Sequence, residues 1–476
     1  MKDRISAIKN NKMNDIKQII KESKVTLVDI QRNLDNLLEK KHFKPRTDLK
    51  MLKEISKDFF TDTIYPRMLG LSGLRGTGKT TLLWQTAKYI YENDFNRDIY
   101  FFNVEKLIDL GISISDVSRA IEKMPEFQKR TVLLFDEVHE DPRWSKRIKI
   151  LYDSNPAFII CTGSSALLLQ TTADLATRMH ILHTFPLQFT EYVNIVQNKQ
   201  LDNEEEVKST LKSALFFSEN IEDCKEKIQK IEPQISAFYK TVENDSELVF
   251  RYITIHNITR FTKMNNRQVI IREMEKLFRR VITDDIPKLI RRNYTYKNSE
   301  KLLLRLAASD EINIQSLSQV LGISGNEINE NLDILEEAEL INILLPFGGY
   351  DTKINKNKKA FFMSPSVRLA LLSQVTEKPE FSSKFHEDIV VMYLRRYFSK
   401  AVLSYASFKK ARNPDFIIET IPEPVIIEVG TNKKSIHQIT KSKIDYRYGI
   451  IINAEAGEMQ YGQNTAIVPL KWFLLL

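Results

Sequence analysis

The chain has 476 residues, a formal net charge of +8 at pH 7 and 42% hydrophobic residues. This length exceeds what one hydrophobic core usually serves, so we expect about two to four domains. Cys161 and Cys224 are the only cysteines, which excludes a disulfide framework and a cysteine-based zinc site and suits a reducing cytoplasm. No apolar run is long enough to cross a bilayer, and the charged first residues do not have the pattern of a signal peptide. We therefore expect a soluble, cytoplasmic protein without a membrane partner.

The first 48 residues form a lysine-rich stretch in which apolar residues recur at helical spacing. This spacing predicts about two or three amphipathic helices in an N-terminal extension. Acidic residues are interspersed among the lysines. This mixture favours packing on the following domain, or on a neighbouring subunit, over a nucleic-acid-binding arm.

A glycine-rich loop lies between the short apolar run Arg67–Ser72 and a stretch of helical period, Thr80–Asn93. Its spacing is that of a Walker A motif, G-x-x-x-x-G-K-[ST], in which backbone N–H groups surround a polyphosphate. Lys79 would reach the β- and γ-phosphates, and the Thr80 hydroxyl would bind Mg²⁺. We therefore expect ATP and Mg²⁺ as ligands, with a nucleotide-binding set of Gly73, Leu74, Arg75, Gly76, Thr77, Gly78, Lys79, Thr80 and Thr81.

A second buried strand, Thr131–Phe135, runs into Asp136 and Glu137, the form that a Walker B segment takes. Asp136 would support the Mg²⁺ shell. Glu137, one residue further, would deprotonate the attacking water as general base.

Residues 49–192 alternate strands and helices, which predicts a P-loop core with a parallel sheet covered on both faces. A further strand lies between the phosphate loop and the Asp136 strand. This arrangement is typical of the branch of P-loop proteins that uses a catalytic glutamate. Thr162 and Ser164 follow the strand Ala157–Cys161 and would sense the γ-phosphate from the neighbouring strand end. A plain turn that caps the next helix is the alternative for either residue.

A known family resembles this part of the chain. The resemblance lies in Phe135–Trp144, Leu151–Asp153, Thr162–Ser165, Arg178 and Phe185–Tyr192. These stretches resemble prokaryotic AAA-type ATPases that are fused to a winged helix and a restriction-endonuclease-like C-terminal domain. The resemblance implies that Arg178 is a phosphate sensor or arginine finger, and a surface ion pair is the alternative role.

Residues 193–298 have a helical pattern and match the lid and connector of that family. Residues 299–372 read as a winged helix, with helices at Leu302–Ala308, Ile314–Leu321 and Ser324–Leu340 and wing strands at Ile341–Leu345 and Lys359–Met363. The outward residues of the third helix are acidic, from Glu327 to Glu339, which argues against a helix that reads DNA bases. DNA would instead contact a basic wing that carries Lys353, Lys356, Lys358 and Lys359. A structural or protein-contacting winged helix, within a homo-oligomer or with a protein partner, is the preferred interpretation.

Residues 373–476 resemble a PD-(D/E)xK nuclease domain. Asp415 opens one strand and Glu428 ends the next, so their carboxylates would hold Mg²⁺. Gly430 stands where the motif requires a lysine, and Lys433 or Lys434 would have to replace it. Glu387, on a preceding helix, would complete the site. An inactive copy of the fold is the alternative.

The predicted fold class is therefore α/β: a P-loop core, a helical lid, a winged helix and a restriction-endonuclease-like domain. The predicted function is a Mg²⁺-dependent ATPase that acts as a nucleotide-controlled switch for its C-terminal domains. The alternatives are an ATP-gated DNA or RNA nuclease, in a phage-defence or mobile-element setting, and a nucleotide-loaded scaffold with little turnover.

Overall fold

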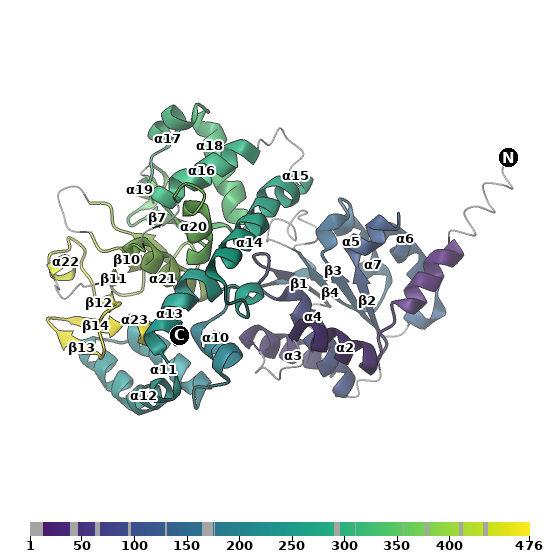
Figure 1. The fold of residues 1–476 in the computed structure, drawn as a ribbon, viewed down its shortest axis with the longest axis horizontal. Coiled ribbons are helices and arrows are strands. Elements are labelled where there is room, and N and C mark those ends of the chain that lie inside the picture. Colours follow the sequence, from purple (N-terminus) through teal and green to yellow (C-terminus); the bar gives the residue numbers. More distant parts are fainter. Residues whose placement is uncertain are drawn as a thin grey trace. The chain divides into compact units, whose positions relative to one another are not determined.

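The chain folds into two compact units. Unit 1 comprises Met1–Thr184 and Arg280–Tyr294, and unit 2 comprises Phe185–Arg279 and Thr295–Leu476. Figure 1 shows the course of the chain in this computed structural model. The structure describes residues 13–38, 46–61, 67–93, 97–128, 131–163, 175, 177–289, 296–309, 311–355, 357–376, 379, 381–408, 413–431 and 437–476. Among them, no helix combines the length and the apolar character that a bilayer span requires.

Unit 1 contains a five-stranded parallel sheet in the order β2-β3-β4-β1-β5. The strands are β1 (Met68–Ser72), β2 (Ile99–Asn103), β3 (Val132–Asp136), β4 (Phe158–Thr162) and β5 (Met179–His183). The helices between them include α4 (Lys79–Glu92), α5 (Val104–Asp109), α6 (Ile114–Ile121) and α7 (Trp144–Ser154). In space β4 separates β1 from β3, whereas β2, the strand that lies between the phosphate loop and β3 along the chain, is at the edge of the sheet. The strand next to the phosphate-loop strand is therefore a later one than the sequence suggested.

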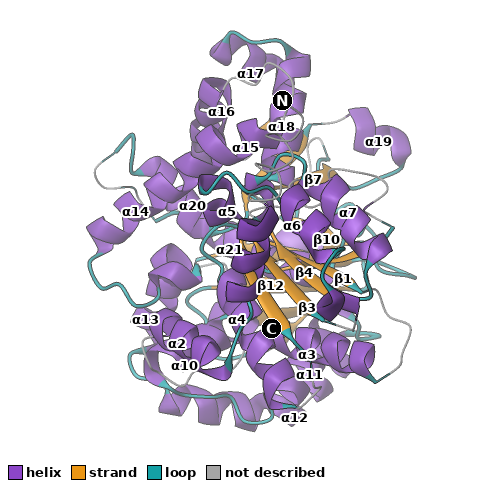
Figure 2. Cartoon of the chain, turned by 90° about the vertical axis from the view of Figure 1, so that its right-hand side faces the viewer, coloured by secondary structure: helices purple, strands orange, loops and turns teal. Residues whose placement is uncertain are grey.

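Both faces of this sheet are buried. Leu133 and Phe135 of β3 pack into one hydrophobic cluster, while the alternate residues Val132 and Leu134 pack into another. Successive side chains of a strand point to opposite faces, so these two clusters lie on opposite sides of the sheet. Figure 2 shows helices around the strands β1, β3 and β4. The prediction of a parallel sheet covered on both faces is therefore confirmed.

The N-terminal helices pack on this sheet. They are residues 13–22, α2 (Leu27–Leu38) and α3 (Thr47–Phe60). Ile16 and Ile20 join one hydrophobic cluster and Ile30 joins the other. Between the first two helices, the Val25 N–H donates to the Ile99 carbonyl of the edge strand β2 at 2.8 Å. The expected helical extension is thus a part of the unit 1 core.

The first part of unit 2 is helical, as predicted. Its helices are α10 (Phe189–Gln197), α11 (Glu204–Phe216), α12 (Ile221–Thr241), α13 (Asp245–Arg251) and α14 (Arg267–Arg280), and the turns η3 (Tyr252–His256) and η4 (Thr259–Phe261) lie between α13 and α14. The segment after α14, with η5 (Val281–Asp285) and α15 (Ile286–Leu289), belongs to unit 1.

Residues 296–372 follow the order helix, strand, two helices and a strand pair. The elements are α16 (Tyr296–Ala308), β6 (Glu311–Ile312), α17 (Ile314–Leu321), α18 (Gly325–Glu337), β7 (Ile341–Pro346), α19 (Tyr350–Asn355), β8 (Lys358–Phe362) and α20 (Pro365–Leu372). Strand β8 pairs antiparallel with β6 and β7. The predicted helices and strands are present, and the segment between the two wing strands, which carries Lys353, also contains the short helix α19. The cause is local, because the Thr352 and Lys353 N–H groups turn back onto the Gly349 carbonyl.

The C-terminal part of unit 2 continues the same sheet. Its elements are α21 (Ser383–Tyr397), β9 (Leu403–Tyr405), β10 (Phe416–Ile418), β11 (Val425–Gly430), α22 (His437–Thr440), β12 (Tyr448–Asn453), β13 (Gln460–Gly462), β14 (Thr465–Pro469) and α23 (Leu470–Phe473). Because β7 pairs in parallel with β9, one nine-stranded sheet runs β13-β14-β12-β11-β10-β9-β7-β8-β6. The division of the chain into five domains stays a prediction.

Candidate nucleotide site

The phosphate loop connects the carboxyl end of β1 to the first turn of α4. Two of its glycines, Gly76 and Gly78, have φ angles of 84° and 98°, in the left-handed region that favours glycine. A Cβ at Gly73 would lie 2.4 Å from the Thr184 carbonyl oxygen. Glycine is therefore required for close packing at one position and for the backbone turn at two others. The loop leads into the N-terminus of α4, where unpaired N–H groups attract anions.

Lys79 begins α4 and is buried. Its ammonium donates to the Gly73 carbonyl at 2.8 Å and to the Leu74 carbonyl at 3.3 Å. The positive charge is therefore held within the loop itself. This placement fits a polyphosphate that is bound by the same backbone turn, because an ammonium has three donor hydrogens and interacts as a point charge.

Asp136, at the end of β3, lies beside Thr80. The Thr80 hydroxyl donates to both carboxylate oxygens of Asp136, at 3.1 and 3.0 Å. Burial and then the charge of Glu137 raise the pKa of Asp136 to about 6, against hydrogen bonds from two threonines that lower it. A hydroxyl and a buried carboxylate side by side are the hard oxygen ligands that Mg²⁺ takes, so these residues fit a Mg²⁺–nucleotide complex.

Thr162, at the end of the neighbouring strand β4, is fully buried and joins the two acidic residues. Its hydroxyl donates to Asp136 Oδ1 at 2.6 Å and accepts the Glu137 N–H at 2.9 Å. The side chain therefore fixes the carboxylate of Asp136 and the backbone of Glu137 at once. Its role as a γ-phosphate sensor stays a prediction, and Ser164 lies outside the described residues.

Glu137 has a left-handed backbone, with φ 55° and ψ 50°. Such a conformation is unfavourable for a residue with a side chain and is held by surrounding contacts. One of these contacts is the hydrogen bond from its N–H to Thr162. The carboxylate is partly exposed, and its Oε2 atom lies 3.3 Å from His139 Nδ1. A partly exposed carboxylate next to Asp136, the predicted metal ligand, fits the position of a general base.

Arg75, within the phosphate loop, makes a two-pronged ion pair with Asp285. Its Nε and one terminal nitrogen donate to the two carboxylate oxygens at 2.6 and 2.9 Å. Burial alone would lower the pKa of Arg75, but the hydrogen bonds and charge of Asp285 outweigh it and raise that pKa. This pair and the neighbouring His139 were not predicted, because Asp285 is 210 residues from Arg75 and no local motif connects them.

Arg178, on the approach to β5, donates from Nε to Asp153 Oδ1 at 3.0 Å. This contact is the surface ion pair named above as the alternative role. A sensor or finger function of Arg178 stays a prediction.

The C-terminal carboxylates Asp415 and Glu428 lie on two paired strands: Asp415 directly precedes β10, whereas Glu428 lies inside β11, two residues before its end and not at the end itself as expected. The antiparallel register sets Phe416 opposite Ile427, so it places Asp415 opposite Glu428. Asp415 Oδ2 accepts the Val429 N–H at 2.8 Å, and Glu428 is fully buried. Glu387 lies on α21, which packs against β11. Lys433 and Lys434, the proposed substitutes for the missing lysine, lie outside the described residues.

The basic wing differs from the expectation in the part that the structure describes. Lys353 sits on α19, and its ammonium lies 3.0 Å from Glu419 Oε1, so its charge is paired within unit 2. The Lys359 ammonium lies over the Tyr405 ring, 5.2 Å from the ring centre. Lys356 lies outside the described residues. Lys353 therefore does not offer an unpaired positive charge to DNA phosphates.

Comparison with known proteins agrees with the geometry of unit 1. Residues 65–193 match a family model described as an AAA domain, and residues 258–378 match a domain of unknown function, DUF8612. The chain therefore contains an AAA-type P-loop ATPase domain.

The chain is 29% identical over 445 residues to the uncharacterized protein MJ1637 of Methanocaldococcus jannaschii. The aligned region covers 91% of this chain and 89% of that protein. Among solved structures, the Thermotoga maritima RuvB Holliday junction branch migration motor matches with 15% identity and a TM-score of 0.26, over 63% of this chain and 89% of that one. The Aeropyrum pernix ORC1 protein, solved in complex with DNA, matches with 11% identity and a TM-score of 0.31, over 75% and 96%.

Proposed function

We propose that the protein binds ATP with Mg²⁺, hydrolyses it, and uses the bound nucleotide to set the state of its C-terminal domains. The observation that carries this proposal is the hydrogen-bonded chain of Thr80, Asp136, Thr162 and the Glu137 backbone. This chain connects Thr80 and Asp136, the proposed Mg²⁺ ligands, to Glu137, the candidate base. It lies at the carboxyl ends of parallel strands, where such folds bind ligands.

Each residue has a separate task in this proposal. Lys79 and the backbone N–H groups of the loop bind the β- and γ-phosphates, while Thr80 and Asp136 would hold Mg²⁺. Mg²⁺, when bound, supplies charge neutralisation on the phosphate oxygens. Glu137 accepts a proton from the attacking water at a carboxylate oxygen. Thr162 holds the Asp136 carboxylate and the Glu137 backbone in place, so it acts as a positioning residue.

For unit 2 we propose a winged helix at residues 296–372 and a restriction-endonuclease-like fold after it. The order of elements supports the first assignment, since a helix, a short strand, two helices and a strand pair follow one another. The second is supported by Asp415 and Glu428, which face each other across β10 and β11. Nucleotide-dependent control of these domains would follow the general logic of P-loop switches.

ATP turnover by the purified full chain tests the hydrolysis proposal. Glu137→Gln should keep its affinity for Mg²⁺-ATP and hydrolyse it about a hundred to ten thousand times more slowly, the usual contribution of a general base. The matched control is Glu92→Gln, because Glu92 is an exposed residue at the end of α4 that pairs with Lys88. Glu92→Gln should behave like the natural protein. Full turnover by Glu137→Gln would show that the base lies elsewhere.

A further inference from the structure

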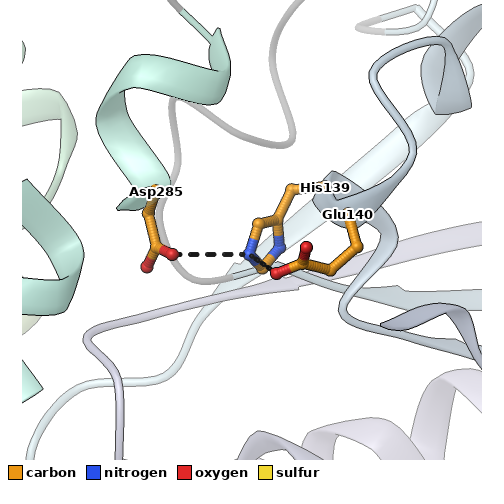
Figure 3. A group of neighbouring side chains, drawn as sticks. All are labelled: His139, Glu140 and Asp285. Atoms are coloured by element: carbon orange, nitrogen blue, oxygen red, sulfur yellow. Dashed lines mark ion pairs between the residues drawn. The ribbon is translucent and has the colours of Figure 1, made fainter. Parts of the chain in front are cut away.

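His139 lies in the short turn after Glu137, and its imidazole is completely buried. Neither ring nitrogen makes a hydrogen bond with any described residue. Nδ1 lies 3.3 Å from Glu137 Oε2, while Nε2 lies 3.5 Å from Glu140 Oε1 and 3.9 Å from Asp285 Oδ1. Figure 3 shows the ring between Glu140, its sequence neighbour, and Asp285, which comes from a distant segment.

None of the described residues donates a hydrogen bond to the ring. A neutral imidazole carries a proton on one nitrogen and a lone pair on the other, whereas an ionised carboxylate only accepts hydrogen bonds. Whichever nitrogen of His139 lacks the proton therefore faces an oxygen acceptor. A metal ion is one species that would satisfy that lone pair and, at the same time, the surrounding carboxylates.

Burial lowers the pKa of His139, whereas the charges of Glu137, Asp285 and Glu140 act to raise it. Arg75 adds to this lowering by its positive charge. Metals bind the neutral form of imidazole through a ring nitrogen.

We propose that His139, Glu140 and Asp285 bind a divalent transition-metal ion of the zinc type, at a site separate from the Mg²⁺–nucleotide ligands Thr80 and Asp136. One ligand atom from each residue lies within 4.8 Å of the others. Tetrahedral ligands about 2.0–2.2 Å from an ion are about 3.4 Å apart. The Nε2–Glu140 separation of 3.5 Å already meets this value, and the Nε2–Asp285 separation of 3.9 Å is a few tenths longer. An imidazole with two carboxylates suits zinc better than magnesium or calcium, which take oxygen ligands.

The local charge also supports a cation. The groups that face His139 are the carboxylates of Glu137, Glu140 and Asp285 and the guanidinium of Arg75. Three carboxylates against one guanidinium leave two negative charges around a buried ring. Asp285 can serve both partners, because each of its oxygens has two acceptor lone pairs and Arg75 uses one on each.

Binding at Nε2 would have a consequence for the neighbouring Glu137. It places the remaining ring proton on Nδ1, which lies 3.3 Å from Glu137 Oε2. A ligand imidazole commonly donates this second N–H to a carboxylate, and that contact orients both groups. This consequence rests on the proposed role of Glu137, whereas the metal site itself does not.

The test is a metal titration of the full chain without nucleotide. The protein, freed of metals with EDTA, is titrated with Zn²⁺ by calorimetry and with Co²⁺ by visible absorption. We expect one saturable ion per chain and the intense visible bands of tetrahedral Co²⁺. Both should be lost in His139→Ala and, independently, in Asp285→Asn, with circular dichroism to confirm that each variant is folded.

Two control variants show whether the ion binds at His139 or at another place on the chain. The double variant Thr80→Ala, Asp136→Asn removes the Mg²⁺ ligands and should keep the Zn²⁺ site. His180→Ala removes an exposed histidine of β5 and should also keep it. Equal Zn²⁺ binding by His139→Ala would overturn the proposal, as would the absence of saturable binding to the natural protein. ATP turnover is not used, so this outcome is independent of the hydrolysis proposal.

Discussion

The hydroxyl of Thr162 donates to Asp136 Oδ1 over 2.6 Å and accepts the backbone N–H of Glu137 over 2.9 Å. One side chain of β4 thus holds two consecutive residues at the end of β3. Thr162→Val keeps the shape of the side chain and removes both hydrogen bonds. Leaving buried polar groups unsatisfied costs about 1–3 kcal/mol, so we expect ATP turnover to fall by about five- to a hundredfold.

The control for this variant is Thr86→Val. Thr86 is also fully buried, but its hydroxyl donates to the Leu82 carbonyl one turn earlier in α4. Steady-state ATP turnover should be close to natural in Thr86→Val and low in Thr162→Val. Equal turnover in the two variants would remove Thr162 from the catalytic arrangement.

Lys79→Ala should abolish nucleotide binding, because it removes the positive charge that the phosphate loop holds between the Gly73 and Leu74 carbonyls. Lys88→Ala, on the same helix but at its surface, should bind normally. A fluorescence titration with labelled ATP measures both affinities. Unchanged affinity in Lys79→Ala would contradict the assignment of the loop.

We expect the folded protein to lose stability in acid because of two buried histidines of unit 2. Burial lowers the pKa values of His256 and His386 to about 4. For His256 the neighbouring charge of Arg251 adds to this lowering, against the Met264 carbonyl, which raises it. His256 Nδ1 faces the Tyr192 hydroxyl at 2.7 Å and Nε2 faces the Met264 carbonyl at 3.0 Å. This pair of contacts suits the neutral ring with its proton on Nε2.

The unfolded chain binds a proton at each of these histidines below pH about 6.5, while the folded chain does so only near pH 4. Stability is therefore present above pH 6.5 and is lost as the pH falls toward 4. We expect the free energy of unfolding to drop by on the order of 1–3 kcal/mol for each histidine between pH 7 and pH 4.5. Urea unfolding at several pH values measures this slope. The dependence of the unfolding free energy on pH should be weaker in His256→Gln and unchanged in His180→Gln. The same pH dependence in both variants would refute the role of His256.

The C-terminal carboxylates should support little or no nucleic-acid cleavage in the natural protein. Asp415 and Glu428 face each other, but Gly430 lacks the ammonium that would stabilise an attacking hydroxide. In Gly430→Lys, Mg²⁺-dependent cutting of DNA or RNA should rise, and Glu428→Ala added to it should abolish the gain. Robust Mg²⁺-dependent cleavage by the natural chain that is lost in Glu428→Ala would contradict this expectation. If the double variant Lys433→Ala, Lys434→Ala also lost that cleavage, one of these two lysines would be the substitute for the missing lysine.

Local signals predicted much of unit 1. The glycine spacing before Lys79 and the buried run before Asp136 each lie within a few residues, so short-range geometry determines them. The same holds for the helices and strands of residues 296–372, where hydrophobic periodicity is strong. The sequence placed Thr162 next to the site as well, although its two hydrogen bonds depend on the order of β3 and β4 in the sheet.

Long-range contacts could not be predicted in this way. Arg75 meets Asp285 across 210 residues, and no spacing rule relates a phosphate loop to a carboxylate so far along the chain. His139 carried no signal beyond its place in a family resemblance, because its burial among three carboxylates needs the folded chain. The pairing of Lys353 was not predicted either, for a different reason. Charge suggested that Lys353 could contact DNA phosphates, whereas a helical turn begins at the Gly349 carbonyl and the lysine pairs with Glu419.

The assignment of residues 280–294 to unit 1 has a practical consequence for anyone who expresses the ATPase part alone. The chain leaves unit 1 after Thr184, returns at Arg280 and leaves again after Tyr294. A fragment that stops near residue 192 would keep every Walker residue and yet lose Asp285. The guanidinium of Arg75 would then be left half-buried beside Glu137 and Glu140 without its carboxylate partner. A single-chain fragment that joins residue 184 to residue 280 through a flexible linker would retain that partner.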